Sequence, residues 1–274
     1  GNLLPEDVAR RHERICQDVA KGRKNGGRKR NRLATGHSAA NGTMRVVRAV
    51  WNHARVARLV EGDNPVSVIS HARGWYPEQR RDTVIAAGQL PAFVKAVKAL
   101  RSENSRDLIL LMLYTGLRVR EACTLEWGDV DLKNQLLHLP AERTKAGRPL
   151  DLPLSDTVTK LLAARPVVGK WVFPGARGHA QEPKAALAVV EKATGHHITS
   201  HDLRRTFTTV AYAARVPEVE IKAMVNHALG TDVTAGYHVP GPEWLREPVR
   251  MVEAKYKELL ATKATRSSRK TAQA

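Results

Sequence analysis

The sequence predicts a mainly α-helical protein with a small antiparallel β-sheet, in which a helical domain precedes a larger α+β domain. Most segments place apolar residues at helical spacing, whereas two short apolar runs on either side of a Gly-containing turn indicate a hairpin. A stretch of weak periodicity around Gly74 and Pro77 separates the two parts. We expect domains at residues 1–82 and 83–261, followed by a disordered basic tail at 262–274.

The composition of this 274-residue chain indicates a polyanionic partner. Lys and Arg number 45 against 27 Asp and Glu, a net charge of +18, and 42% of the residues are hydrophobic. Nucleic acid is the first candidate partner and an acidic membrane surface is the second. We expect neither a membrane span nor a secretory signal, since no apolar run approaches roughly 20 residues. With only Cys16 and Cys123, a reducing compartment is favoured over a disulfide framework.

The N-terminal domain is predicted to begin with a helix over 4–20, because Pro5 suits its first turn and acidic residues follow it. Residues 21–32 then hold seven cations, three glycines and no acidic residue. Such a loop can follow DNA phosphates, and a solvated loop is the alternative interpretation. The DNA-contacting candidates in this loop are Lys21, Arg23, Lys24, Arg28, Lys29 and Arg30.

A second helix is predicted over 38–60, with two different faces, and ends before Pro65. One broad apolar arc would pack on the core and consists of Val46, Val47, Val50, Ala54 and Ala57. Another arc is polar and could lie on DNA, although a solvated basic face is the alternative. Its members are Arg45, Arg48, Asn52 and Arg55.

The second domain begins with a short helix at 90–100 and a helix at 106–114 that is apolar on every side, which predicts burial. Gly116 can take the left-handed cap of the latter helix, and another helix starts directly after it. Arg118 therefore lies at a helix start close to the interior. A structural ion pair with Glu121 is one interpretation, and Glu121 could at the same time orient Arg118 in a functional site.

Two strands are predicted at 135–139 and 148–152, and the turn between them carries Lys145. At such a tip Lys145 could reach into a groove, although a solvated lysine is the alternative. The elements expected next are a helix at 155–164, a short strand at 171–173 and a helix at 182–192.

The segment 201–205, His-Asp-Leu-Arg-Arg, is predicted to start a further helix. His201 and Arg204 are three residues apart and project from one face, where an imidazole beside a guanidinium suits an oxyanion such as a phosphate. Solvated or salt-bridged side chains are the alternative. Arg205 is expected to be structural or to contact the DNA backbone. The remaining elements are a helix at 218–225, a turn at 231–235 that leads through Gly236 to Tyr237, and a last helix at 243–260.

The order of six residues resembles that of the tyrosine recombinase family, the phage-type integrases. "TGLRVREACTLEW" at 115–127 resembles its first arginine box and "TKAGRPLDLPL" at 144–154 its lysine hairpin. "HDLRRTFTT" at 201–209 resembles its His-x-x-Arg box, and "VEIKAMVNHALGTDVTAGY" at 219–237 its His-then-Tyr box. Residues 41–66 resemble the end of the helical core-binding domain that precedes the catalytic domain. The six residues are Arg118, Lys145, His201, Arg204, His227 and Tyr237.

Two features depart from the family pattern. Asn226 stands where the family usually has Gly, and Asn is the non-Gly residue that best tolerates a left-handed backbone. No arm-binding domain of the kind that many integrases carry is evident in the sequence.

The resemblance implies a site-specific recombinase that cuts and rejoins DNA through a covalent 3′-phosphotyrosine, for integration or excision of a phage or other mobile element. Arg118 and Arg204 would bind the scissile phosphate, and His227 would donate a further hydrogen bond. Tyr237 would be the nucleophile, with His201 as its base, and Lys145 would protonate the leaving 5′ oxygen. No metal, ATP or other cofactor is expected, because the phosphoester is exchanged rather than hydrolysed.

Two other functions use the same residues differently. A type IB topoisomerase-like enzyme would relax DNA without synapsis, and a sequence-specific DNA-binding protein of this fold would lack catalysis. A metal site at His196, His197 and His201 is disfavoured, because acidic or Cys ligands at known spacing are missing.

The expected partner is double-stranded DNA at recombination sites. On DNA we expect a homotetramer and without it a monomer, with accessory DNA-bending proteins as a further class of partner and no membrane. Residues 243–260 and the basic tail are candidates for an element exchanged between subunits, and packing within one chain is the alternative. The expected location is the cytoplasm of a bacterial or archaeal host, in association with its nucleoid.

Overall fold

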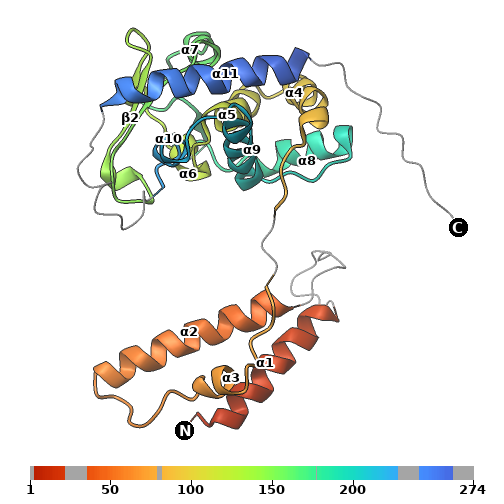
Figure 1. Cartoon of the computed structure of the whole chain (residues 1–274), viewed down its shortest axis with the longest axis vertical. Coiled ribbons are helices and arrows are strands. Elements are labelled where there is room, and N and C mark those ends of the chain that lie inside the picture. The colour runs from red at the N-terminus through yellow and green to blue at the C-terminus, as the bar shows by residue number, and fades with distance from the viewer. Residues whose placement is uncertain (1–2, 22–35, 79–81, 177, 228–240, 262–274) are drawn as a thin grey trace, which may run out of the picture. The chain divides into compact units, whose positions relative to one another are not determined.

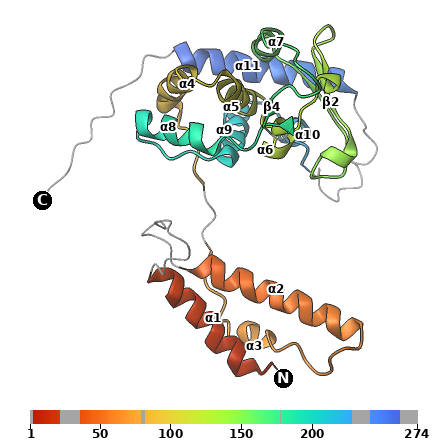
Figure 2. The ribbon, with the colours of Figure 1, turned by 180° about the vertical axis from the view of Figure 1, so that it is seen from behind.

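The computed structural model divides the chain into two compact units, Gly1–Arg81 and Asp82–Ala274. Figures 1 and 2 show them from opposite sides. None of the helices in the described part of the chain is long and apolar enough to cross a membrane. The residues that the structure describes are 3–21, 36–78, 82–176, 178–227 and 241–261.

Unit 1 is built from α1 (Pro5–Ala20), α2 (His37–Val56) and the short α3 (Ser67–His71), with α1 in contact with both other helices. At the start of α2, Gly36 has φ +77°, and a Cβ there would lie 2.3 Å from the Cys16 carbonyl oxygen. Glycine therefore allows α2 to begin against the end of α1. The small core consists of Val8, Met44, Val66 and Ile69, with Ile15, Val47, Val68 and Trp75 packed against it.

The predicted apolar face of α2 is wrong in part. Val46 and Val50 are each 63% exposed, whereas Ala40 and Met44 are buried. The sequence shows little periodicity after Pro65, so α3 was not predicted. The segment after Pro65 contacts the side of α2 that carries Arg45 and Arg48, through Ser70, Trp75 and Glu78.

Unit 2 has α5 (Glu103–Thr115) at its centre, packed against α4 (Leu90–Lys98), α9 (Ser200–Ala213) and α6 (Val119–Cys123). The predicted burial of α5 is confirmed, since every residue from Leu108 to Leu113 is buried. Ser102 caps the start of α5, because its hydroxyl accepts from the amide of Ser105 at 3.2 Å. Gly116 ends it with φ +68°, as predicted.

The last helix, α11 (Arg246–Ala261), packs on α9 and α4 of its own chain. Figures 1 and 2 show it lying along the body of unit 2. Val252 and Tyr256 are buried, and the Tyr256 hydroxyl donates to the Leu113 carbonyl at 2.7 Å. This helix is therefore packed within its own subunit, and the basic tail at 262–274 lies outside the described residues.

The predicted hairpin is present as β2 (Leu136–Leu139) and β3 (Leu150–Pro153), which pair antiparallel. The sheet has the order β1-β2-β3, where β1 (Val130–Asp131) was not predicted. The strand expected at 171–173 is wrong, because Trp171 forms only an isolated bridge with Glu126. A two-stranded ribbon of β4 (Pro174–Gly175) and β5 (Gly178–His179) follows instead. The hairpin buries Leu137, Leu139, Leu150 and Leu152 on one face.

Short elements complete unit 2. The further helices are α7 (Asp156–Ala163), α8 (Lys184–Thr194) and α10 (Glu218–Met224), and the single 3₁₀ turns are η1 (Ala87–Gln89), η2 (Trp127–Asp129), η3 (Ala141–Arg143) and η5 (Pro242–Leu245).

Candidate active site

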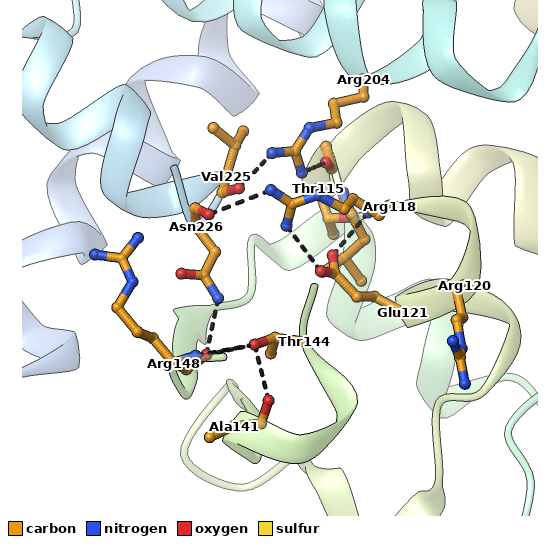
Figure 3. A network of polar contacts seen from close by, with 12 residues as sticks. Thr115, Arg118, Arg120, Glu121, Ala141, Thr144, Arg148, Arg204, Val225 and Asn226 are labelled. Atoms are coloured by element: carbon orange, nitrogen blue, oxygen red, sulfur yellow. Dashed lines mark hydrogen bonds and ion pairs between the residues drawn. The ribbon is translucent and has the colours of Figure 1, made fainter. Parts of the chain in front are cut away.

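A polar cleft with a volume of about 620 Å³ opens on unit 2. Five of the six residues singled out in the sequence line it, although they come from four separate segments. The sixth, Tyr237, lies outside the described residues. Figure 3 shows the polar network beside the cleft. The predicted residues that line it are Arg118, Lys145, His201, Arg204 and His227.

Arg204 projects from the first turns of α9 and is only 5% exposed. Its Nη1 donates to the Gly116 carbonyl at 2.7 Å, and its Nη2 donates to the Val225 carbonyl. Burial, together with the nearby charge of Arg118, lowers the pKa of Arg204 to about 10. The guanidinium therefore remains charged at neutral pH and is held rigidly by two backbone oxygens.

Arg118 stands immediately before α6 and is fixed by Glu121. One oxygen of the Glu121 carboxylate accepts from the Arg118 amide at 2.9 Å, and the other accepts from Nη1 at 2.8 Å. Glu121 is 2% exposed, so the burial of its charge is compensated by this guanidinium. The Arg118 Nη2 reaches the Asn226 carbonyl at 3.3 Å. Both arginines thus converge on the turn after α10, as Figure 3 shows.

That turn is a Schellman motif, in which the chain reverses through a left-handed residue. The His227 amide donates to the Lys222 carbonyl at 2.8 Å, and the Asn226 amide donates to the Ala223 carbonyl at 2.9 Å. Asn226 has φ +48°, which confirms the expectation that Asn can stand here in the left-handed conformation. The motif ends α10 and places His227 at the cleft.

Two imidazoles face the cleft, and their surroundings favour the neutral form of both. Burial, then the charges of Arg205, Arg204 and Lys145, lower the pKa of His201, although Asp202 opposes them. Burial, then Arg204 and Arg118, lower the pKa of His227. A neutral imidazole can accept a proton as well as donate one, which is what a general base requires.

Asp202 organises the start of α9 around His201. Its carboxylate accepts from the Thr199 amide at 2.9 Å and from the Thr199 hydroxyl at 2.6 Å. An acidic side chain at this position also complements the positive end of the helix. His201 consequently lies in the first turn of a well-capped helix.

Lys145 lies in the loop between β2 and β3 and is exposed at the cleft. The residue before it, Thr144, is buried, and its hydroxyl contacts the Arg148 carbonyl at 2.6 Å and the Ala141 carbonyl at 3.1 Å. The loop is thereby closed on itself below Lys145, which leaves the ammonium group free to extend over the cleft.

Comparison with known proteins identifies the family. The model of the phage integrase family matches residues 83–239, more than half of the chain. The chain belongs to the phage integrase family.

Over the aligned residues, curated relatives are between a quarter and a third identical to this chain. It is 29% identical over 185 residues to the integrase of Shigella phage Sf6, covering 64% of this chain and 47% of that one. It is 33% identical over 132 residues to the prophage integrase IntZ of Escherichia coli (strain K12), covering 46% of this chain and 32% of the other. The chain thus spans about half the length, or less, of these relatives.

Solved structures share its fold. A lambda integrase dimer bound to a COC′ core site superposes with a TM-score of 0.61 at 16% identity, covering 82% of this chain and 79% of that one. The Tn1549 transposon integrase in complex with circular intermediate DNA gives 0.58 at 16% identity, covering 90% and 84%. The predicted fold, mainly α with a small antiparallel sheet, is confirmed.

The residues predicted to contact DNA in unit 1 of this integrase-family chain fall into three groups. Arg45 contacts Glu78 at 3.2 Å, Arg48 donates to the Ser70 hydroxyl at 2.7 Å, and both guanidiniums lie over the Trp75 ring. Asn52 accepts from Asn64 at 2.7 Å. These three side chains are therefore engaged within the unit. Lys21 and Arg55 are exposed, whereas Arg23, Lys24, Arg28, Lys29 and Arg30 lie outside the described residues.

Four further side chains lie at or beside the site, and one of them, Arg205, was expected to be structural or to contact the DNA backbone. Arg205 contacts Asp202 at 3.5 Å, beside His201, where its charge bears on the imidazole. Arg148 and Glu182 line the cleft without having been singled out, since nothing in their local sequence distinguishes them. Asn226 was noted for its backbone alone. As for metals, the described residues contain no group of three or more His, Cys, Asp or Glu that could hold an ion.

Proposed function

We propose that this protein is a site-specific DNA recombinase that cleaves and rejoins DNA strands through a covalent phosphotyrosine at Tyr237. The observation that carries the proposal is the convergence of Arg118, Arg204, His201 and His227 on one cleft, at whose rim Lys145 lies. Two guanidiniums and two imidazoles together are suited to a phosphodiester. Family membership supports the same conclusion.

The arginine pair would bind the scissile phosphate. Each guanidinium is planar and permanently charged, and the pentavalent transition state carries more negative charge on its non-bridging oxygens than the ground state does. Glu121 holds Arg118, and the Gly116 and Val225 carbonyls hold Arg204, so that neither side chain needs to reorganise when that charge develops. His227 would donate a further hydrogen bond to the phosphate.

The bond exchange needs one proton acceptor and one proton donor. The Tyr237 oxygen forms a bond to phosphorus while the bond from phosphorus to the 5′ oxygen breaks, which leaves a 3′-phosphotyrosine. His201, neutral at pH 7, would take the phenolic proton, and Lys145 would give a proton to the 5′ oxygen. Religation is the reverse exchange, so the cycle uses no net water and needs no ATP.

A suicide substrate tests the proposal. A pool of nicked duplexes with randomised sites releases a short 5′-hydroxyl fragment on cleavage, so the covalent adduct accumulates and its DNA can be sequenced. We expect adduct from the wild type, in EDTA as well, and none from Tyr237→Phe. Adduct from the Phe variant would overturn the nucleophile. DNA binding without adduct from the wild type would favour the non-catalytic alternative.

The finer properties are also part of the proposal. One solved relative of this fold is described as a lambda integrase tetramer bound to a Holliday junction. We propose that this protein likewise acts as a tetramer on double-stranded DNA in the host cytoplasm, which distinguishes it from a relaxing enzyme that works as a monomer. Unit 1 would contribute DNA contacts through its basic residues, including Lys21 and Arg55, as the core-binding domain. Sedimentation with and without a cleaved site sequence measures the assembly.

A further inference from the structure

We propose that Asn226 is a positioning residue that couples the hairpin bearing Lys145 to the turn bearing His227. The inference rests on the proposed function, because its consequence is the delivery of a proton by Lys145. Asn226 is buried between the two elements, with 6% of its surface exposed. Its side-chain nitrogen donates to the Arg148 carbonyl at 3.0 Å, as Figure 3 shows.

The Arg148 carbonyl is the point where the two elements join. One of its lone pairs accepts from the Thr144 hydroxyl at 2.6 Å, and the other accepts from Asn226. Thr144 precedes Lys145, and Asn226 precedes His227. The Arg148 carbonyl oxygen therefore connects the residue before Lys145, the candidate proton donor, to the residue before His227, the candidate phosphate ligand.

Lys145 lies between two anchors. On its N-terminal side, Arg143 donates to the Thr124 carbonyl at 3.2 Å and pairs with Asp129 and Glu126. On its C-terminal side, the loop is exposed at Gly147, Arg148 and Pro149, and Asn226 ties it to the body of unit 2. Removing the Asn226 side chain would leave this second end of the loop tied to Thr144 but no longer to the turn after α10, which would enlarge the region that the ammonium group samples.

The side chain, not the backbone of Asn226, is what this coupling needs. The left-handed φ of +48° is open to Gly as well, at lower steric cost. The Arg118 contact uses the Asn226 carbonyl, which every residue has. Asn226→Gly would therefore keep the Schellman turn, the arginine pair and His227 in place and remove the contact with the hairpin alone.

The test separates proton delivery from phosphate binding. In the substrate with a 5′-bridging sulfur, the leaving group is a thiolate, which departs without a proton because thiols are far stronger acids than alcohols. We expect Asn226→Gly to slow single-turnover cleavage about tenfold with the oxygen substrate, a fraction of what a general acid contributes. With the sulfur substrate its rate should stay within about twofold of the wild type.

Two further variants sharpen the result. Lys145→Ala should show the same rescue by sulfur, and adding Asn226→Gly to it should cause no further slowing with oxygen, because both act on one step. Asn134→Gly is the matched control, since Asn134 occupies an exposed turn outside the cleft, where its side-chain amide donates to Asp131 and its carbonyl accepts from Arg246. It should leave both rates unchanged.

Each outcome is decisive. Equal slowing of Asn226→Gly on both substrates, or none on either, would overturn the positioning role. Additive slowing in the double variant would also overturn it. If the wild type forms no adduct with either substrate, the proposed function itself fails. This result differs from the results above, which overturn only the positioning role of Asn226. A normal rate with sulfur shows that the variant is folded.

Discussion

Arg118 and Arg204 donate hydrogen bonds to the carbonyl oxygens of two consecutive residues, Asn226 and Val225. One guanidinium comes from the residue before α6 and the other from α9, yet they meet at the Schellman turn that ends α10. The turn therefore does two things at once: it places His227 at the cleft and it orients the pair of cations beside it.

Glu121→Gln should weaken catalysis more than folding. The amide has one acceptor oxygen instead of two and no charge, so it cannot accept from both the amide and the guanidinium of Arg118. We expect adduct formation to slow by roughly 10- to 100-fold, in the range seen when a supporting partner is removed. The matched control is Glu247→Gln, whose ion pair with Arg250 is exposed. Suicide-substrate kinetics measure both variants. Equal rates of adduct formation in the Glu121→Gln and Glu247→Gln variants would show that Glu121 does not support the site.

Gly116→Ala should be more destabilising than Gly195→Ala. Both glycines end a helix with positive φ, 68° and 75° respectively, so both variants share a strain of about 1–2 kcal/mol. A Cβ on Gly116 would lie 2.5 Å from the Phe207 ring, whereas one on Gly195 would meet nothing within 4 Å. Overpacking should add about 1–3 kcal/mol to the loss in free energy of unfolding at Gly116. Urea denaturation compares the two, and similar losses would mean that Phe207 moves aside freely.

The pH dependence of cleavage should have an acidic limb set by His201. Its pKa lies below the usual value, so the neutral base persists at pH 7 and is lost as the pH falls through the lowered pKa. Among the neighbouring charges, Arg205 lowers the pKa of His201 most. Arg205→Gln removes this charge, so the acidic limb should move to higher pH. The pKa of the His201 ring, measured by NMR titration, should shift in the same direction. An acidic limb that does not shift in this variant would exclude His201 as the base.

The same shifts predict how stability varies with pH. The pKa values of His201 and His227 are lowered in the folded state, so below their usual pKa the unfolded chain binds more protons than the folded one. The stability that the two neutral imidazoles contribute is fully present above the usual histidine pKa. The free energy of unfolding should therefore decline as the pH falls from 7 toward 5. The decline should be smaller in the double variant His201→Gln/His227→Gln. A decline of equal size in the double variant would assign it to other groups.

Tyr256→Phe should separate the buried tyrosine from the nucleophile. Burial raises the pKa of Tyr256 well above its usual value, and the hydroxyl donates to the Leu113 carbonyl. Loss of this bond leaves a buried carbonyl without its donor, which should cost about 1–3 kcal/mol, while Tyr237 still forms the adduct. Tyr212→Phe is the control, because Tyr212 is 51% exposed, and it should be nearly neutral. Thermal melts and gels that detect the adduct distinguish these outcomes. Loss of the adduct in a folded Tyr256→Phe variant would contradict the assignment of Tyr237 as the nucleophile.

Several local features could be predicted because short-range interactions determine them. The burial of α5, the glycine that ends it and the hairpin around Lys145 follow from periodicity and turn residues. The strand expected at 171–173 failed because an apolar Trp-Val-Phe run is equally suited to an irregular buried segment. The face of α2 was assigned wrongly in part because the side on which a helix packs depends on its partners, here α1 and the segment after Pro65, and that segment has almost no periodic signal.

The sequence by itself determined which residue types stand at which helix starts and turns, and with them the family and the candidate chemistry. Only the tertiary structure decided that Arg204 is held by Gly116 and Val225, that Arg118 reaches Asn226, and that the side chain of Asn226 bridges to the hairpin. The reason is physical. Helix caps and turns depend on neighbours within about five residues, whereas these contacts join segments that approach one another only when the core around α5 and α9 has packed.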